Sequence, residues 1–176
     1  TAAFATVHVT PLQLDQPVPL RYRDGSTSGL TVTAVAVAGD PPRFARHDHP
    51  GHTVGLIVAD EHSGGRAGFF PGCGALDEPL LGRLSSLDLL LLDGTFWSDD
   101  EMIRQGLSER TAREMAHLPL SGAEGSLAAL GTISCRRKVY THINNSNPIL
   151  VEDSAERRLV EAAGVQVGHD GMRFTL

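Results

Sequence analysis

Three side chains with acid–base or metal-binding chemistry come directly after hydrophobic segments of the sequence. Asp93 follows four consecutive leucines, His117 ends an apolar helical pattern, and His142 comes just after a strand pattern. Open α/β sheets place their sites beyond the carboxyl ends of their strands. A carboxylate and two imidazoles in such positions could bind a metal ion or exchange protons with a substrate.

Each of these residues also has an ordinary structural interpretation. Asp93 precedes a glycine and could close a turn or cap a helix. His117, at the end of a helical pattern, could simply complement the helix dipole. His142 is followed by three asparagines, a serine and a proline, which is more than one turn needs. That segment is therefore either a complex loop or a strand end that presents His142 to a ligand.

The densest group of histidines lies elsewhere, in residues 46–52, which read Arg-His-Asp-His-Pro-Gly-His. This pattern resembles a histidine-rich metal-binding segment, but metal ligands usually come from separated elements with supporting hydrogen bonds. We expect instead that these residues form a mobile loop at the mouth of the cavity that holds Asp93, His117 and His142. Its protonated imidazoles would contact an acidic substrate. The residues concerned are His47, Asp48, His49 and His52. The isolated histidines are interpreted as structural: His8, His62 and His169.

Cys73 lies in a Gly-Cys-Gly turn between a strand pattern and a helix pattern. No basic residue adjoins it to lower the pKa of its thiol, so we interpret it as structural. Cys73 and Cys135 lie far apart in the sequence and do not form a disulfide framework, which fits a cytoplasmic protein. The glycine-rich turns lack the fingerprint of a nucleotide-binding loop.

The composition is that of an ordinary globular protein, with 41% hydrophobic and 20% charged residues. A length of 176 residues fits a single domain, residues 1–176. The formal net charge of −6 argues against nucleic-acid binding. No apolar run reaches the roughly 20 residues of a membrane span. We therefore expect a cytoplasmic chain with neither nucleic-acid nor membrane partners.

Hydrophobic periodicity predicts antiparallel strands first, followed by alternating helices and buried strands. The fold class is α/β or α+β, with one mixed sheet covered by helices on one face. The predicted strands are 4–10, 30–38, 53–60, 66–70, 87–92, 138–141, 165–168 and 172–176, with a hairpin turn at 61–65. The predicted helices are 76–84, 98–106, 108–116, 121–130 and 154–163.

Four motifs occur in order along the chain: LLLLDGTFWSDDEM, REMAHLPLSG, RKVYTHINNSNPIL and EDSAERRLVEAAGVQVGHDGM. Together they resemble the PqqB family of pyrroloquinoline quinone (PQQ) synthesis proteins, within the metallo-β-lactamase superfamily. The resemblance implies an α/β fold, the four-layer αββα sandwich, of which this chain would form mainly the C-terminal half. We therefore expect a fragment without the N-terminal half. Its sheet face from residues 31–38 and 53–60 would be apolar and uncovered, so the chain alone should self-associate, pair with an N-terminal fragment or fold poorly.

The resemblance also implies roles for individual residues. His142 stands where the superfamily keeps its final metal-ligand histidine, and Asn144 and Asn145 would be loop residues that orient it. Asp93 and His117 are similar to a carboxylate–imidazole dyad of related tRNA-processing hydrolases. In that role Asp93 would orient His117, which would act as general acid or base. A supporting or substrate-contacting role is also open to His47, His49 and His52.

By resemblance, the family hydroxylates the tyrosine ring of a cross-linked Glu–Tyr dipeptide with non-haem iron (Fe²⁺) and O₂. Many superfamily hydrolases carry a metal-bridging aspartate in the turn that reads Pro71-Gly72-Cys73-Gly74 here. Its absence favours one iron over a two-metal hydrolytic site, with zinc as the alternative metal. The histidine–aspartate motif that supplies most superfamily ligands is also absent, so activity of this chain alone is not expected.

Three functions stay open at this point. They are an iron-dependent hydroxylase of PQQ biosynthesis, a metal-dependent hydrolase of the same fold, and a non-catalytic protein that binds or transports PQQ or its precursor. The partners that the resemblance implies are the dipeptide precursor and other PQQ biosynthesis proteins, and a homo-oligomer is compatible with it.

Overall fold

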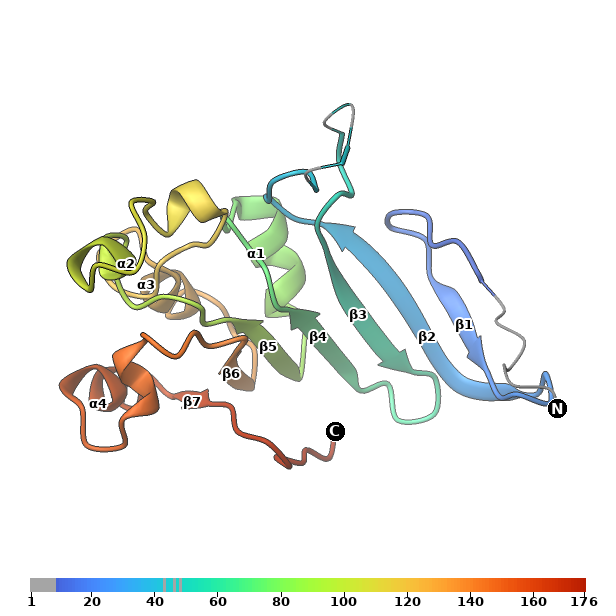
Figure 1. Ribbon diagram of the computed structural model, residues 1–176. Helices are drawn as coiled ribbons and strands as arrows, with labels where there is room; N and C mark the ends of the chain where they lie inside the picture. Colours follow the sequence, from blue (N-terminus) through green and yellow to red (C-terminus); the bar gives the residue numbers. More distant parts are fainter. Residues whose placement is uncertain (1–8, 43, 46, 48) are drawn as a thin grey trace, which may run out of the picture.

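The computed structural model describes residues 9–42, 44–45, 47 and 49–176. In this part of the chain the strands form one seven-stranded sheet, in which each strand lies beside its neighbours in sequence (Figure 1). The first four strands pair antiparallel and the last four pair parallel. The strands are β1 (Val18–Arg21), β2 (Thr27–Ala36), β3 (Val54–Asp60), β4 (Arg66–Phe70), β5 (Leu89–Asp93), β6 (Arg137–Thr141) and β7 (Val165–Val167).

The strand directions bring several carboxyl ends to one edge of the sheet. β2 and β4 both run antiparallel to β3, so they point the same way, and β5 and β6 run parallel to β4. The register pairs Phe70 with Leu92 and Asp93 with Thr141. The segments that follow β4, β5 and β6 are therefore neighbours, which is the arrangement that a shared site requires.

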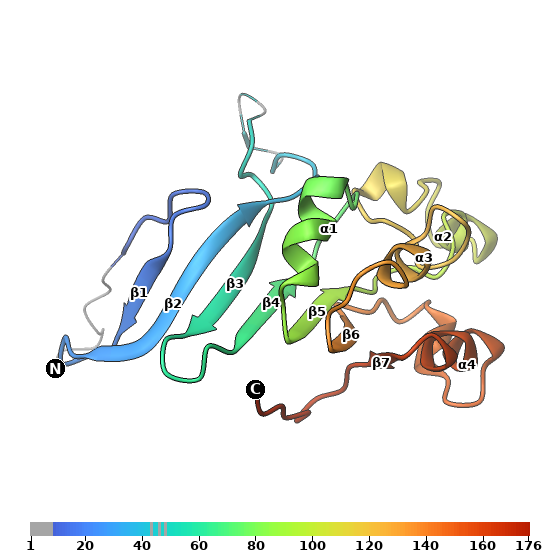
Figure 2. The ribbon, with the colours of Figure 1, turned by 180° about the vertical axis from the view of Figure 1, so that it is seen from behind.

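The leucine run of β5 is buried at the centre of the molecule. Leu90 and Leu92 pack in a core with Phe70 and Tyr140, and all four are at most 1% exposed. The ring of Phe70 lies where any Cβ at Gly55 would be, so glycine is required there. Helices cover this face (Figure 2). The helical segments are α1 (Glu78–Ser85), α2 (Glu101–Arg104), η1 (Arg113–Met115), α3 (Ser126–Leu130), η2 (Pro148–Leu150) and α4 (Ala155–Ala162).

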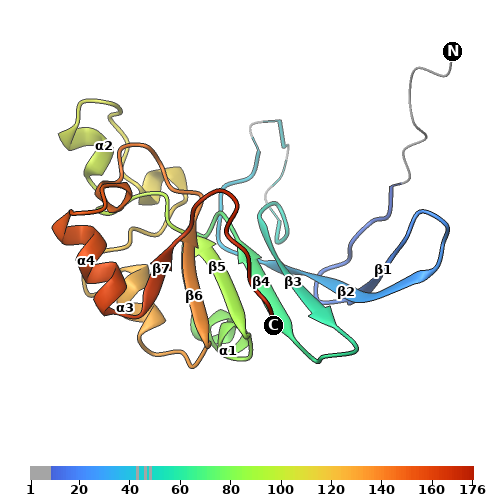
Figure 3. The ribbon, with the colours of Figure 1, turned by 90° about the horizontal axis from the view of Figure 1, so that it is seen from below.

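The opposite face of the sheet is covered only in part by the described residues. The C-terminal segment, residues 168–176, crosses it from β7 towards β4 (Figure 3), and Leu176 lies against Gly65. Phe69 is 42% exposed on this face, and Leu56 beside it is half-buried. The uncovered apolar surface therefore centres on Phe69 of β4, whereas the prediction drew it from residues 31–38 and 53–60; among the described residues β2 and β3 expose no large hydrophobic side chain, and the tail covers the region of β6.

Most predicted elements are present, and the differences have local causes. Residues 108–116 form only the short turn η1, because Ser108 and Thr111 accept hydrogen bonds from nearby backbone N–H groups and compete with a helix. The helices predicted at 98–106 and 121–130 are reduced to α2 and α3.

The two ends of the sheet also differ from the prediction. β1 was not predicted because Pro19 lies within it, and proline is tolerated there only because β1 is an edge strand. Residues 172–176 form no strand within the described chain, since no neighbouring strand is available to them. Of the strand predicted at 4–10, residues 1–8 lie outside the described part. No helix of the described residues combines the length and apolarity needed to cross a bilayer.

Candidate functional site

Asp93 is a buried carboxylate at the end of β5, and both of its oxygens accept hydrogen bonds. Oδ2 accepts from the Cys73 backbone N–H at 3.1 Å and from His117 Nδ1 at 2.6 Å. Oδ1 accepts from the backbone N–H of Thr95 at 3.1 Å and from its hydroxyl at 2.5 Å. The Asp93 side chain is 2% exposed, so these donors replace the water that it loses. A carboxylate has about four acceptor positions, and these donors fill them.

His117 reaches Asp93 from the segment between α2 and α3. The next residue, Leu118, donates its backbone N–H to the Cys73 carbonyl at 2.9 Å, which joins this segment to the turn after β4. The His117 ring packs edge-on against Phe96, with ring centroids 5.7 Å apart, and its side chain is 19% exposed. The imidazole is thus largely enclosed and contacts Asp93 through Nδ1.

His142 is the first residue after β6, and its Nδ1 lies 3.7 Å from Asp93 Oδ1. The same nitrogen lies 2.8 Å from Thr95 Oγ1. The ring stacks on His117 with centroids 5.6 Å apart, while the side chain is 54% exposed. The backbone φ of His142 is 54°, in the left-handed region that non-glycine residues seldom occupy. The structure therefore brings together the three residues that the sequence singled out.

The hydrogen bonds assign the protons of both imidazoles. A carboxylate only accepts, so Nδ1 of His117 must carry the hydrogen that it donates to Asp93. The Thr95 hydroxyl has one hydrogen and three acceptors in reach, Asp93 Oδ1 at 2.5 Å, His142 Nδ1 at 2.8 Å and the His142 carbonyl at 3.0 Å; we place the hydrogen on the shortest contact, to the charged acceptor Asp93. Thr95 Oγ1 must then accept from Nδ1 of His142. In the neutral rings, Nε2 of both histidines keeps a free lone pair.

Asp93, His117 and His142 have the composition of a metal site. Their ligand atoms all lie within 4.8 Å of one another. This set consists of one carboxylate oxygen of Asp93 and one ring nitrogen of each histidine. Because the acceptor positions of Asp93 are filled, the carboxylate fits the partner that orients metal-bound histidines. The residues present therefore fit a metal bound through imidazole.

The turn after β4 supplies a backbone N–H to Asp93 but no ligand atom. Cys73 is 1% exposed, and its Sγ donates to the Ala75 carbonyl at 3.1 Å. Burial raises the pKa of the Cys73 thiol to about 12. A thiol must lose its proton to bind a metal, so this geometry supports the structural interpretation of Cys73.

The loops after β5 and β6 are tied together by residues that sequence analysis did not single out. Asn147 is 1% exposed, donates from Nδ2 to the Gly94 carbonyl at 2.9 Å and accepts from Ile149 N at 3.1 Å. Gly94 N–H donates to the Thr141 carbonyl at 2.7 Å. A Cβ on Gly94 would lie 2.8 Å from Cβ of Tyr140. Only glycine therefore allows the two loops to approach this closely.

Asn144 and Asn145 make no side-chain hydrogen bond to the three-residue cluster within the described chain. The Asn144 amide donates to Ser146 Oγ and, at 3.5 Å, to Met102 Sδ, and Asn145 is exposed. Thr95 and Asn147 make the supporting contacts in their place. Thr95 could have been found from its position two residues after Asp93, where a hydroxyl can bond the carboxylate.

The histidine loop, residues 46–52, follows β2 at the same edge of the sheet, and its described ring nitrogens contact carbonyl groups of the loop itself. The rings of His49 and His52 stack with centroids 4.0 Å apart. His52 Nε2 lies 2.8 Å from the His47 carbonyl, and His49 Nδ1 lies 3.0 Å from the Pro50 carbonyl. Asp48 lies outside the described residues. Among the described residues, no metal-ligand cluster includes these histidines.

The isolated histidines behave as surface residues where they are described. His62 is exposed beside Asp60, with 3.5 Å between Nδ1 and Oδ1. His169 Nδ1 lies 3.1 Å from the Asp170 carbonyl. His8 lies outside the described part of the chain.

The sequence matches a known family over most of its length. Residues 2–143 match the β-lactamase superfamily domain. The chain belongs to this superfamily. A relative from Gluconacetobacter diazotrophicus, coenzyme PQQ synthesis protein B, is 44% identical over 172 residues, which cover 94% of this chain and 55% of the relative. The protein of the same name from Pseudomonas protegens is 46% identical over 150 residues, covering 84% and 50%. The chain is a PqqB homologue that spans about half the length of the curated relatives it matches.

Solved structures of the superfamily show the same fold. Zn²⁺-bound PqqB from Methylobacterium extorquens has a TM-score of 0.78 and 37% identity, covering 94% of this chain and 51% of that one. A diphosphatase from the PhnP family has a TM-score of 0.53 and 17% identity, covering 92% and 47%, and supports the fold alone. The predicted fold class, a mixed sheet forming about half of the metallo-β-lactamase sandwich, is confirmed.

Proposed function

We propose that this chain contributes part of the site of a PqqB-type protein in PQQ biosynthesis, acting in the cytoplasm. The observation that carries the proposal is the pair of imidazoles of which His117 bonds Asp93 directly and His142 bonds it through Thr95, with no hydrogen bond to either Nε2 from the described residues. The similarity to proteins named for PQQ synthesis supports it. The specific reaction that we propose is hydroxylation of the tyrosine ring of the cross-linked Glu–Tyr precursor.

In this proposal His142 is a metal ligand, and Asp93 with His117 forms a proton-transfer pair. Asp93 holds the Nδ1–H of His117 and stabilises the ring when Nε2 takes up a proton, because a nearby carboxylate favours the charged imidazole. His117 Nε2 then acts as general base or acid towards bound substrate. Iron(II) bound at His142 would supply redox chemistry with O₂, whereas zinc would activate water.

The turn after β4 supports one metal rather than two. A two-metal hydrolase needs a ligand that bridges the ions. In the turn where many superfamily hydrolases carry the bridging aspartate, this chain has Cys73. The buried thiol of Cys73 stays protonated because burial raises its pKa to about 12. A two-metal hydrolase of this fold is therefore the less favoured reading.

The cluster by itself is short of ligands. A catalytic zinc site uses three protein ligands, and in this proposal the chain supplies one of them, His142. We infer that the missing ligands come from the part of the family's domain that this chain does not span. That part would pack on the uncovered face around Phe69, with a second copy of this chain as the alternative occupant. Co-expression with the N-terminal half of a PqqB relative should raise both solubility and metal content.

A non-catalytic carrier of PQQ or its precursor is the second candidate, and the same shortage of free ligands favours it. Metal analysis and O₂ consumption with the cross-linked dipeptide separate the candidates, using the co-expressed halves and a His142→Ala control. A hydroxylase should hold one iron and consume O₂ with substrate. Two metals without O₂ consumption would indicate a hydrolase. Substrate binding with neither metal nor O₂ consumption would indicate a carrier and overturn the proposal.

A further inference from the structure

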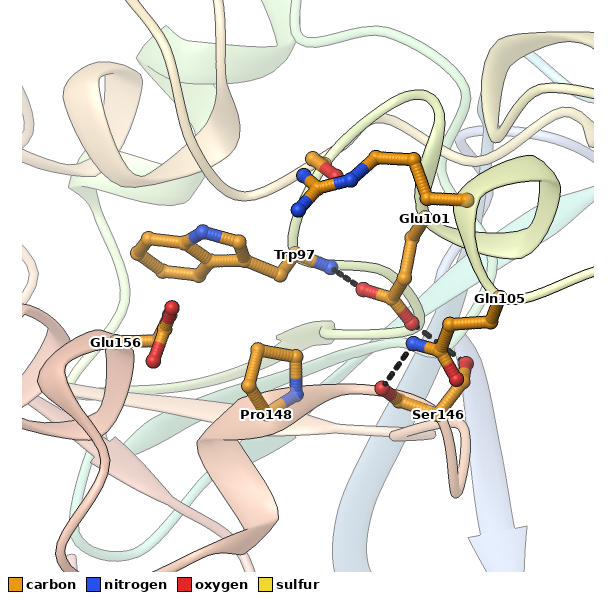
Figure 4. Close-up of a pocket in the computed structure, with 8 residues that line it drawn as sticks. Trp97, Glu101, Gln105, Ser146, Pro148 and Glu156 are labelled. Atoms are coloured by element: carbon orange, nitrogen blue, oxygen red, sulfur yellow. Dashed lines mark hydrogen bonds between the residues drawn. The ribbon is translucent and has the colours of Figure 1, made fainter.

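Glu101, at the start of α2, has a buried carboxylate with two hydrogen-bond donors. The residue is 5% exposed. Oε2 accepts from the backbone N–H of Trp97 at 2.6 Å, and Oε1 accepts from the Ser146 hydroxyl at 2.5 Å (Figure 4). Burying a carboxylate is costly unless it is hydrogen-bonded. The two bonds are therefore the reason that the side chain can stay in this position.

These two donors belong to the two loops that carry the candidate site. Trp97 lies in the loop that follows β5, and Ser146 lies in the loop that begins with His142. Close to the strands, the loops are joined where Asn144 N–H donates to the Thr95 carbonyl at 3.1 Å. The buried carboxylate joins them again at their far end. The two loops are thus linked at both ends.

Other atoms of the α2 region hold the same serine. Gln105 Nε2 donates to the Ser146 carbonyl at 3.0 Å, and Ser146 Oγ lies 3.5 Å from Met102 Sδ. Figure 4 shows Glu101 between Trp97 and Ser146, with Gln105 beside it. These residues line a cavity of about 310 Å³ that also includes Pro148. The loop after β6 is therefore docked on α2 by several contacts, of which the carboxylate is the charged and most buried one.

We propose that Glu101 is a positioning residue that sets the His142 imidazole beside Asp93 by cross-linking the two loops. The inference rests on the proposed function, in which His142 binds the metal. His142 is 54% exposed and has a left-handed backbone. Neither burial nor backbone preference holds its ring, so its position depends on how its loop is tied to the loop that carries Thr95.

A purely local role for Glu101 makes a different prediction. Its bond to Trp97 N–H closes the turn before α2, and that bond alone would suffice for such a role. The bond to Ser146 does not close this turn and serves only the connection between the loops. Ser146→Ala keeps the Trp97 bond, and Glu101→Ala keeps the contact of the Asn144 amide with Ser146 Oγ, so only an effect that both variants share reports on positioning.

The first test is a zinc titration of this chain co-expressed and purified with the N-terminal half of a PqqB relative, in competition with a chromophoric chelator. Ser146→Ala should weaken zinc binding by about tenfold, and Glu101→Ala by up to about a hundredfold, which is typical for partners that orient metal ligands. Glu101→Gln should fall between Glu101→Ala and the parent, because its amide oxygen can still accept from Trp97. Zinc binding by both alanine variants equal to the parent would overturn the inference.

A matched control is Asp77→Ala, which removes the N-cap of α1, where Oδ1 accepts from Leu80 N at 2.9 Å. It should lower the melting temperature through loss of the cap while leaving the zinc affinity unchanged. A decrease in zinc affinity equal to that of Ser146→Ala would show that general destabilisation, and not positioning, weakens the site.

The second test needs no metal and separates failure of this inference from failure of the proposed function. Amide hydrogen exchange of Asn144 reports on its bond to Thr95. Its rate should rise at least about tenfold in Ser146→Ala and Glu101→Ala relative to the parent and to Asp77→Ala, since the opened loop loses protection. Unchanged rates overturn the inference. If the parent shows no His142-dependent zinc binding but the exchange rates rise as expected, the metal site fails and the loop cross-link stands.

Discussion

Two histidine-bearing regions lie at the same edge of the sheet, and among the described residues one of them gathers its side chains into a potential ligand cluster. In the histidine loop, His49 and His52 are close in sequence and stack on each other, but their ring nitrogens contact carbonyls of the same loop. His117 and His142 are far apart in sequence, yet one buried carboxylate connects them: Asp93 bonds His117 directly and His142 through the Thr95 hydroxyl. Histidine density is therefore a weaker sign of a site than a buried acceptor that several elements share.

Removing the shared acceptor should have the largest effect. Asp93→Ala leaves the N–H groups of Cys73 and Thr95 and the Nδ1–H of His117 without a partner. The free energy of unfolding should fall by about 3–5 kcal/mol, as expected when one partner of a buried polar network is lost. Urea denaturation measures this change, with Asp93→Asn expected to lose less because one acceptor oxygen remains. A fall below about 1 kcal/mol for Asp93→Ala would mean that the carboxylate does not organise the region.

Metal affinity should separate the two histidine regions. His142→Ala should weaken zinc binding at least about tenfold, because it removes a free Nε2. The triple variant His47→Ala, His49→Ala, His52→Ala should bind zinc as the parent does. If stoichiometric zinc is lost in the triple variant but retained in His142→Ala, the histidine loop and not the cluster around Asp93 is the metal site.

The close approach of the two loops predicts a stability effect at Gly94. A Cβ there would lie 2.8 Å from Tyr140 Cβ and 3.1 Å from the Thr141 carbonyl. Gly94→Ala should therefore lower the free energy of unfolding by about 1–3 kcal/mol, the usual cost of overpacking. Gly82, within α1, has no atom within 4 Å of such a Cβ, so Gly82→Ala should stabilise by up to about 1 kcal/mol. Equal effects of the two substitutions in urea denaturation would show that the loops can separate freely.

The smallest expected effect concerns pH and the buried thiol beneath Asp93. Burial raises the pKa of Cys73 from 9.0 to about 12. Below pH 9 the thiol is protonated in both folded and unfolded chains. Above it the unfolded chain ionises first, so stability should fall as pH rises from 9 towards 12. Cys73→Ala should reduce this slope in urea titrations at several alkaline pH values. An unchanged slope would show that the thiol is accessible.

Much of the fold could be predicted from local pattern. The continuous leucines of β5 indicate a strand covered on both faces, and the alternating residues of β2 and β3 indicate antiparallel partners. Residues 108–116 were mispredicted because periodicity does not reveal that Ser108 and Thr111 bond to nearby backbone. β1 was missed because only its edge position makes Pro19 acceptable.

The site was predictable in its titratable residues but not in its supporting ones. Asp93 and His142 stand out because each follows an apolar strand, and strand ends at one edge meet in space. Asn147 and Glu101 do not stand out, because whether a polar side chain is buried depends on tertiary packing. Sequence analysis predicted an orienting role for Asn144 because it lies near His142 in the sequence. In the structure, the buried side-chain hydrogen bonds of this loop are made by Asn147.

The central claim is that Asp93 orients His117 directly through Nδ1, and His142 through the Thr95 hydroxyl, and leaves both Nε2 lone pairs free. Long-range ¹H–¹⁵N NMR of the metal-free chain near neutral pH measures the tautomer of each histidine directly. His117 and His142 should both show a protonated Nδ1 and an unprotonated Nε2, and Asp93→Asn should abolish this preference in His117 first, because its bond to the carboxylate is direct. A protonated Nε2 in the neutral ring of either His117 or His142 would contradict the account.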